Sequence, residues 1–148
     1  MDYSKQLASY KQQSVYSMTQ GEMLILLYDE LLKRLKRGKL LLEKKDYANF
    51  EKDITRAGDI IRYLRKILDM KYPISRELVR LYTFYEQHVS RIIASRNPER
   101  IDELIPMIQD LRDAFKEADT LAKKENAGSS SANEPRKIKG EGGTLAVL

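Results

Sequence analysis

The sequence predicts an all-α protein, built as an antiparallel up-down four-helix bundle with a mobile N-terminal arm and a flexible C-terminal tail. Three observations predict this fold class. Four apolar stripes at helical spacing fill most of residues 19–122, short connections separate them, and no run alternates apolar and polar residues as a half-buried strand would. The 148 residues with 42% hydrophobic content suit one core. We therefore divide the chain into an arm (1–18), a bundle (19–125) and a tail rich in Gly and Ser (126–148).

The first helix is predicted to begin after Thr19 and to end near Lys44. Thr19 and Glu22 have the spacing of a capping box, in which each side chain accepts a hydrogen bond from the other residue's backbone N–H. The apolar residues of this helix form one track and extend onto the flanking faces. The track comprises Leu24, Leu27, Leu31 and Leu35, and the flanking residues are Ile25, Tyr28 and Leu32. Because a helix that is apolar on two sides needs two apolar neighbours, we expect more hydrophobic surface here than one buried face can use.

The second helix is predicted to run from the N-cap residue Asp46 to about Asp69. Its apolar positions alternate in steps of four and three residues, the rhythm of a seam between antiparallel helices. These positions are Phe50, Ile54, Ala57, Ile61, Leu64 and Leu68. Gly38 and Gly58 lie inside the first two helices, where each costs about 1 kcal/mol relative to Ala. They mark either tolerated surface positions or a close approach of a neighbouring backbone.

The third helix is predicted to follow a break at Pro73 and a cap at Ser75, and to end near Ser95. Its apolar stripe consists of Leu78, Leu81, Tyr82, Tyr85, Val89 and Ile92.

The fourth helix is predicted to start with Asn97 as its cap and Pro98 at its first position, where a missing N–H has no cost. Its stripe consists of Ile101, Leu104, Ile108, Leu111, Phe115, Ala118 and Ala122. Pro106 removes one backbone hydrogen bond and crowds the carbonyl of Asp102, so we expect a kink or a helix that begins in two pieces.

The chemistry of the chain argues against an enzyme, a metal site and a bound cofactor. The sequence has no Cys and a single histidine, His88, which we expect at a boundary or on the surface. Glu86 lies two residues away and points elsewhere on a helix, so neither a Glu-x-x-His pair nor a zinc motif can form. No glycine-rich phosphate loop occurs. Without a signal-like apolar segment or a run long enough to cross a bilayer, the chain is expected to be cytoplasmic and not inserted in a membrane.

The net charge of +5, with both signs interspersed, is typical of a solvated surface. Lys33-Arg34, Lys36-Arg37 and Lys39 motivate an alternative, a basic helical module that binds nucleic acid. These cations are not confined to one face, so a solvated surface without nucleic acid is favoured. A second alternative is a structural bundle that dimerises through its surplus apolar face.

Several segments, in order and at matching separations, resemble the flagellin export chaperones of the FliS family. They are Tyr10-Lys-Gln-Gln-Ser-Val15, Ser17-Met-Thr-Gln-Gly-Glu-Met-Leu-Ile-Leu-Leu-Tyr28-Asp29, Ala57-Gly-Asp-Ile-Ile61-Arg-Tyr-Leu64, Leu81-Tyr82 and Leu111-Arg112-Asp-Ala-Phe115-Lys-Glu-Ala118. The resemblance covers residues 3–122. The chain departs from the family pattern at Gln20, where Pro is usual, at Phe115, where Trp is frequent, at Pro106 and in its Gly/Ser-rich tail.

The resemblance implies a four-helix bundle that binds the disordered C-terminal segment of flagellin, prevents early filament assembly and delivers the subunit to a component of the export gate. A bundle that receives amphipathic client helices in apolar grooves fits the doubly apolar first helix. For the groove we predict Leu24, Leu27, Tyr28 and Leu31 on the first helix with Ile61, Leu64 and Tyr82 opposite. A homodimer is possible when no client is bound.

Tyr10 and Val15 match the family's N-terminal motif, which implies a part in binding the client or in covering the empty groove. We therefore hypothesise that the segment Tyr3–Tyr16 occupies the groove until flagellin displaces it. The apolar tip Leu145–Leu148 is a second candidate for the same covering role.

Overall fold

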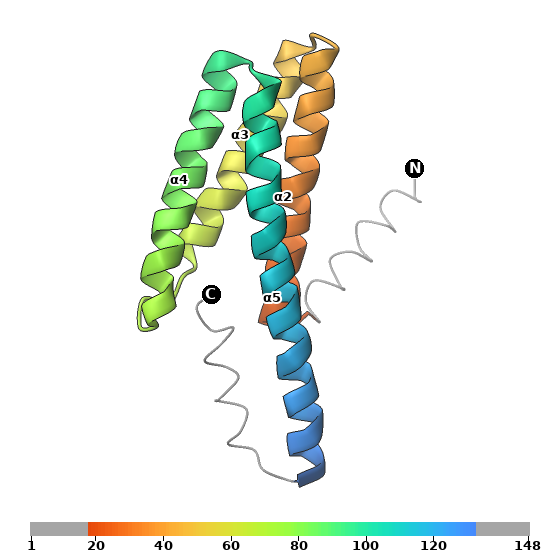
Figure 1. Ribbon diagram of the computed structural model, residues 1–148, viewed down its shortest axis with the longest axis vertical. Coiled ribbons are helices and arrows are strands. Elements are labelled where there is room, and N and C mark those ends of the chain that lie inside the picture. The colour runs from red at the N-terminus through yellow and green to blue at the C-terminus, as the bar shows by residue number, and fades with distance from the viewer. Residues whose placement is uncertain (1–17, 133–148) are drawn as a thin grey trace, which may run out of the picture.

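The computed structural model describes residues 18–132, and within them it contains helices and no strand (Figure 1). The helices are α2 (Gln20–Glu43), α3 (Tyr47–Lys66), α4 (Pro73–Ser95) and α5 (Pro98–Ala132). Successive helices run in opposite directions, and α2 packs against α3 on one side and α5 on the other. The all-α up-down bundle is therefore confirmed. The expected arm and tail fall largely outside the described residues, and the domain boundaries stay a prediction.

Three of the predicted caps are present. The backbone N–H of Glu22 donates to Thr19 Oγ1 at 3.1 Å, and the backbone N–H of Thr19 donates to Glu22 Oε1 at 3.0 Å. Asp46 accepts from the N–H of Asn49, and Asn97 Oδ1 accepts from the N–H two residues later at 3.0 Å. Each cap satisfies a first-turn donor that has no partner inside its helix, which fixes where α2, α3 and α5 begin.

The connection between α3 and α4 differs from the prediction. Helix α3 ends at Lys66 rather than near Asp69, because the Asp69 carboxylate accepts from the N–H of Lys71 and forms a turn there. Helix α4 begins at Pro73 itself, in the first helical position. Ser75 is not its cap: the hydroxyl of Ser75 is buried and donates to the carbonyl of Asp69 at 2.6 Å.

Helix α5 is longer than predicted. It continues through Pro106 as one helix, so of the two outcomes predicted there a helix in two pieces is wrong, and a kink stays a prediction. Pro106 is exposed, and Asp102 is exposed one turn earlier, so water can reach the carbonyl that loses its donor. The helix also continues past residue 122, where its apolar stripe stops, to Ala132. Lys123 holds the start of this stretch, because its Nζ lies 2.8 Å from Glu22 Oε2 on α2 and 3.2 Å from Asp119 Oδ2 one turn earlier.

Both mid-helix glycines are buried between helices rather than on the surface. A Cβ atom on Gly38 of α2 would lie 2.5 Å from Cδ1 and 3.1 Å from Cγ1 of Ile54 on α3. A Cβ atom on Gly58 of α3 would lie 3.3 Å from Cγ1 of Val89 on α4. Gly38 therefore permits the close contact of α2 with α3, whereas the neighbour of Gly58 needs to move only slightly.

We expect Gly38→Ala to lower the free energy of unfolding by about 1–2 kcal/mol, because overpacking outweighs the gain in helix propensity of about 1 kcal/mol. Gly58→Ala is the matched control, since it gains the same propensity with a milder contact, and we expect its stability to be within about 0.5 kcal/mol of the unsubstituted protein. Urea unfolding followed by circular dichroism measures both. A Gly38→Ala protein as stable as the Gly58→Ala protein would contradict this account of the contact.

Asp53 joins α2 to α3 through a buried carboxylate. Arg37 donates to both of its oxygens, each at 2.7 Å, and Arg34 donates to Oδ1 at 3.0 Å. The side chain of Asp53 is 5% exposed. Hydrogen bonds from Arg37 and then Arg34 lower the pKa of Asp53, against the effect of its burial, which acts in the opposite direction. The carboxylate is therefore ionised at neutral pH and attracts both guanidinium groups.

We expect Asp53→Asn to lower the free energy of unfolding at pH 7 by about 1–2 kcal/mol, because two cations then lose their shared anion. A carboxyl whose pKa is lowered by folding stabilises the fold above its unfolded pKa of about 3.9, and that contribution is lost as the pH falls below it. The difference between the variant and the parent protein should therefore shrink between about pH 4 and pH 2. Asp59→Asn, which removes an exposed carboxylate paired with Arg62 on the helix surface, is the control and should change little.

Candidate partner-binding surface

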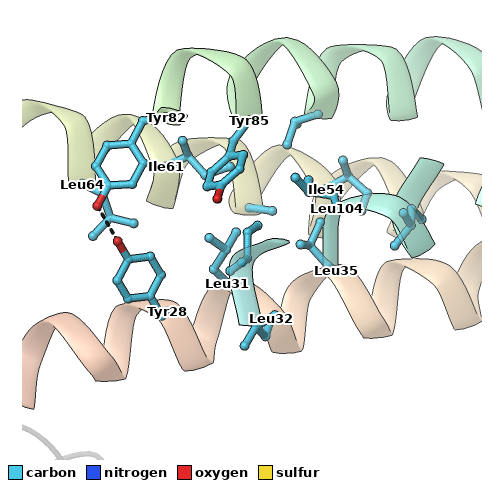
Figure 2. Packing of buried hydrophobic residues seen from close by; sticks show 14 of the residues in the cluster. Tyr28, Leu31, Leu32, Leu35, Ile54, Ile61, Leu64, Tyr82, Tyr85 and Leu104 are labelled. Atoms are coloured by element: carbon cyan, nitrogen blue, oxygen red, sulfur yellow. Dashed lines mark hydrogen bonds between the residues drawn. The ribbon is translucent and has the colours of Figure 1, made fainter. Parts of the chain in front are cut away.

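Six of the seven groove residues predicted in the bundle lie inside the core. Leu24 is 1% exposed, and the other five are fully buried. These five are Tyr28, Leu31, Ile61, Leu64 and Tyr82. Figure 2 shows them on facing sides of α2, α3 and α4, pointing toward one another. Leu27 is partly buried at the edge of this cluster. Their contact with a partner stays a prediction.

The second apolar side of α2 is covered mostly by the chain itself. Ile25 and Leu32 extend the stripe of α2, and they are 7% and 5% exposed because α2 has two neighbours, α3 and α5. Only Leu26 and Leu40, on the outer side of α2, remain as exposed large apolar side chains of this helix. The expected hydrophobic surplus of the first helix is therefore much smaller than its sequence indicates.

Two tyrosine hydroxyls form a polar pair within the core. The hydroxyls of Tyr28 on α2 and Tyr82 on α4 are hydrogen-bonded to each other (Figure 2). The ring of Tyr28 also stacks on Phe115 of α5, with 5.7 Å between the ring centroids. Burial raises the pKa of Tyr82 to about 12 and raises the pKa of Tyr28 well above its ordinary value. Both groups are neutral at pH 7, so the pair links three helices and is not poised for acid–base chemistry.

His88 is 5% exposed, so the expectation of a boundary or surface position is wrong. Its Nε2 lies 2.7 Å from the carbonyl oxygen of Arg100 in the first turn of α5, and an N–H at this atom donates to that carbonyl. The histidine is buried because α4 meets α5 at this point. Among the described residues, no group of three or more His, Cys, Asp or Glu side chains could hold a metal ion.

The contact between His88 and Arg100 identifies the sides of α4 and α5 that face each other. On α4, Phe84 lies one turn before His88 with the two rings 5.8 Å apart, and Leu81 lies two turns before it. On α5, Met107 and Leu111 lie two and three turns after Arg100 on the same side. We call Leu81, Phe84, Met107 and Leu111 the α4–α5 face.

The α4–α5 face is covered incompletely. Helix α4 packs along α3 but contacts α5 over a much smaller stretch, and the two helices diverge away from the turn that joins them (Figure 1). Phe84 is 40% exposed and Met107 is 39% exposed, while Leu81 and Leu111 are half-buried. Ile74, in the first turn of α4, is also exposed. Accessible apolar side chains therefore lie on facing sides of α4 and α5 as well as on the outer side of α2.

Sequence reasoning did not select the α4–α5 face. The signal available was Phe84, a large aromatic residue that lies off the main stripe of α4. Met107 is similarly placed beside the stripe of α5. Tyr10 and Val15, the two arm residues predicted to bind the partner, lie outside the described residues, as do the Tyr3–Tyr16 segment and the Leu145–Leu148 tip.

The basic run of α2 is divided by the fold. Arg34 and Arg37 turn toward Asp53, and Lys39 Nζ lies 2.8 Å from the carboxylate of Asp102 on α5. Lys33 and Lys36 point away from the core. The five cations therefore do not form one continuous stripe along the helix. Their spacing in the sequence predicted this, because it does not confine them to one face. None of the described helices is long and apolar enough to span a membrane.

Comparison with known proteins shows similarity to one family. The family model described as "Flagellar protein FliS" matches residues 3–122. A curated relative, the "Flagellar secretion chaperone FliS" of Bacillus subtilis (strain 168), is 25% identical over 121 residues, which cover 82% of this chain and 91% of the relative. The matched range includes all of α2, α3 and α4, and α5 as far as its apolar stripe extends. The chain therefore belongs to the FliS family, a family of flagellar secretion chaperones and not of enzymes.

Proposed function

We propose that this chain acts in the cytoplasm as an export chaperone that binds the disordered C-terminal segment of flagellin. In this role it prevents early polymerisation of the subunit and delivers it to a component of the flagellar export gate. The name of the Bacillus subtilis relative supports the class of function. The observation that carries the proposal is the α4–α5 face, because Phe84 and Met107 leave apolar surface accessible on two diverging helices. An amphipathic client helix can bury its apolar side there.

The energetics of a disordered client suit a chaperone that must also release its cargo. Ordering a long segment offsets much of the energy gained by burying apolar surface, so a large interface gives only moderate affinity. The hydrophobic contribution depends weakly on salt and produces a negative heat capacity change on binding.

The residues predicted from the sequence have distinct parts in this proposal. Leu27 contacts the client at the edge of the core, and Tyr10 and Val15 either contact the client or cover the apolar face when it is empty. The six buried residues support the helices from within, because a side chain with almost no exposed surface reaches a client only if the helices separate. A bundle that dimerises when free is the alternative, and the same apolar face would then join two copies.

Titration calorimetry with a peptide of about 40 residues from the C-terminus of a flagellin tests the proposal. We expect binding with a large negative heat capacity change. Phe84→Ser and Met107→Ser should each weaken binding by about tenfold, the usual effect of removing an apolar anchor. Tyr63→Ser is the matched control, since Tyr63 is 47% exposed but lies on α3.

Absence of binding, or an equal loss in the Tyr63→Ser protein, would exclude the α4–α5 face as the client site. Sedimentation of the free protein distinguishes the chaperone from the alternative, a structural bundle that dimerises. A stable dimer that the flagellin peptide does not dissociate would favour the structural bundle.

Phenylalanine substitutions test whether the buried tyrosine pair supports the fold or contacts the client. Tyr28→Phe and Tyr82→Phe should each lower the free energy of unfolding by about 1–2 kcal/mol, because each leaves one hydroxyl in the core without its partner. The double variant should lose less than the sum, since no unpaired hydroxyl remains. Affinity for the flagellin peptide should stay within about twofold in the double variant. A large loss of affinity in that protein would show that the hydroxyls themselves meet the client.

A further inference from the structure

The outer side of α2 is bordered by two grooves that share one residue. The groove between α2 and α3 has a volume of about 340 Å³, and the groove between α2 and α5 has a volume of about 660 Å³. Arg37 lines both grooves, so they form one surface that passes over the outer side of α2. We call the two grooves together the α2 basic surface.

Positive charge is concentrated on the α2 basic surface. Its lining holds seven basic side chains and only two carboxylates, those of Asp29 and Asp53. Asp53 is buried and bound by Arg34 and Arg37, and Asp29 pairs with Arg112 at 2.8 Å. This excess of five charges equals the net charge of the whole chain, so the remainder of the protein is balanced.

Four of these cations are free to meet a partner. They are Lys33 and Lys36 on α2 with Lys52 and Arg56 on α3. All four are exposed, and within residues 18–132 none of them has a carboxylate within ion-pairing distance. Cations grouped on one surface without neighbouring anions make the local electrostatic potential positive and favour an anionic ligand.

The surface also offers an apolar anchor. Leu40 is 56% exposed and lies in the wider groove, beside Lys36 and Arg37. Leu32 forms part of the floor of the same groove, and Leu41 lines the other groove. An apolar side chain from a partner can therefore bury against leucine while its neighbouring acidic groups meet the lysines.

This combination of side chains favours an acidic peptide over a nucleic acid. Neither groove is lined by an aromatic side chain on which a base could stack, and Asp29 lies among the cations of the wider groove. The chain's own terminal segments do not complement the charge. Residues 1–17 and residues 133–148 each contain one more basic than acidic residue. The ligand must therefore come from another molecule.

We propose that the α2 basic surface is a docking site for an acidic, amphipathic helical segment of a second protein partner, separate from the client. The helix places leucine-like side chains on Leu40 and Leu41 and carboxylates on Lys33, Lys36, Lys52 and Arg56. The α2 basic surface and the α4–α5 face share no side chain, because α5 contributes Gln109 and Arg112 to the first and Met107 and Leu111 to the second, so the two ligands do not compete for a residue.

Selection from a displayed library of random peptides of about 15 residues, roughly four helical turns, tests this site on the full chain. Free Lys36→Glu/Lys52→Glu protein is added as a competitor, because it removes peptides that bind elsewhere. We expect the recovered peptides to carry net negative charge with apolar residues at i, i+3 and i+4 spacing. Their affinity should fall with added salt and should drop at least about tenfold in the double variant. Lys124→Glu, an exposed reversal far along α5, is the matched control and should leave the affinity unchanged.

Four outcomes would overturn the proposal. The first is recovery of no peptides, or of neutral or basic ones. The second is an equal loss of affinity in the Lys124→Glu protein. The third is tighter binding of a single-stranded oligonucleotide that the double variant abolishes, which would assign the surface to nucleic acid. The fourth is a loss of affinity for the flagellin peptide in the double variant as large as the loss for the selected peptides, which would make the surface part of the client site. Unchanged flagellin binding in the double variant keeps the two sites distinct.

Discussion

The contact of α2 with two neighbours at once is the constraint on which the rest of the structure depends. Gly38 lets α2 approach Ile54 of α3 closely, and the buried carboxylate of Asp53 holds Arg34 and Arg37 across the same interface. On its other side α2 packs against α5. Because α3 and α5 cover α2 on two sides, α2 reaches α4 mainly through the hydrogen bond between Tyr28 and Tyr82, and α4 relies on α3 for most of its packing.

The position of α4 determines where apolar surface stays accessible. The hydrogen bond between His88 and the Arg100 carbonyl holds the end of α4 against the beginning of α5. Farther from that turn, side chains on the same sides of the two helices lose their neighbours, and Phe84 and Met107 remain partly exposed. Exposed apolar side chains that face one another across two helices mark an interaction site more often than isolated ones do. The client surface that we propose thus follows from the way the core is closed.

The sequence predicted the bundle well because stripes and caps are local signals. Thr19 and Asp46 mark the first turns of α2 and α3 as N-caps, and the spacing of the apolar residues in α3 predicts which face of that helix is buried. The sequence could not show which neighbour covers each stripe. From the sequence, Tyr28 and Leu64 fit a position in the core as well as a position in a groove. Only the arrangement of all four helices places them in the core. In the same way, Asp53 looks like a surface residue until Arg34 and Arg37 enclose it.

Binding at the two proposed surfaces depends on different physical forces, so the two binding reactions respond differently to solution conditions. Binding at the α4–α5 face depends on apolar burial and responds weakly to ionic strength, whereas binding around Lys36 and Lys52 depends on charge and is screened by salt. The two surfaces share no side chain. Coupling between ligands requires two states of the protein that the ligands stabilise differently. The core between them is closely packed around Tyr28 and Ile61, so a partner on α2 has little means to weaken the client's hold. A second protein could therefore bind a loaded chaperone without releasing its cargo.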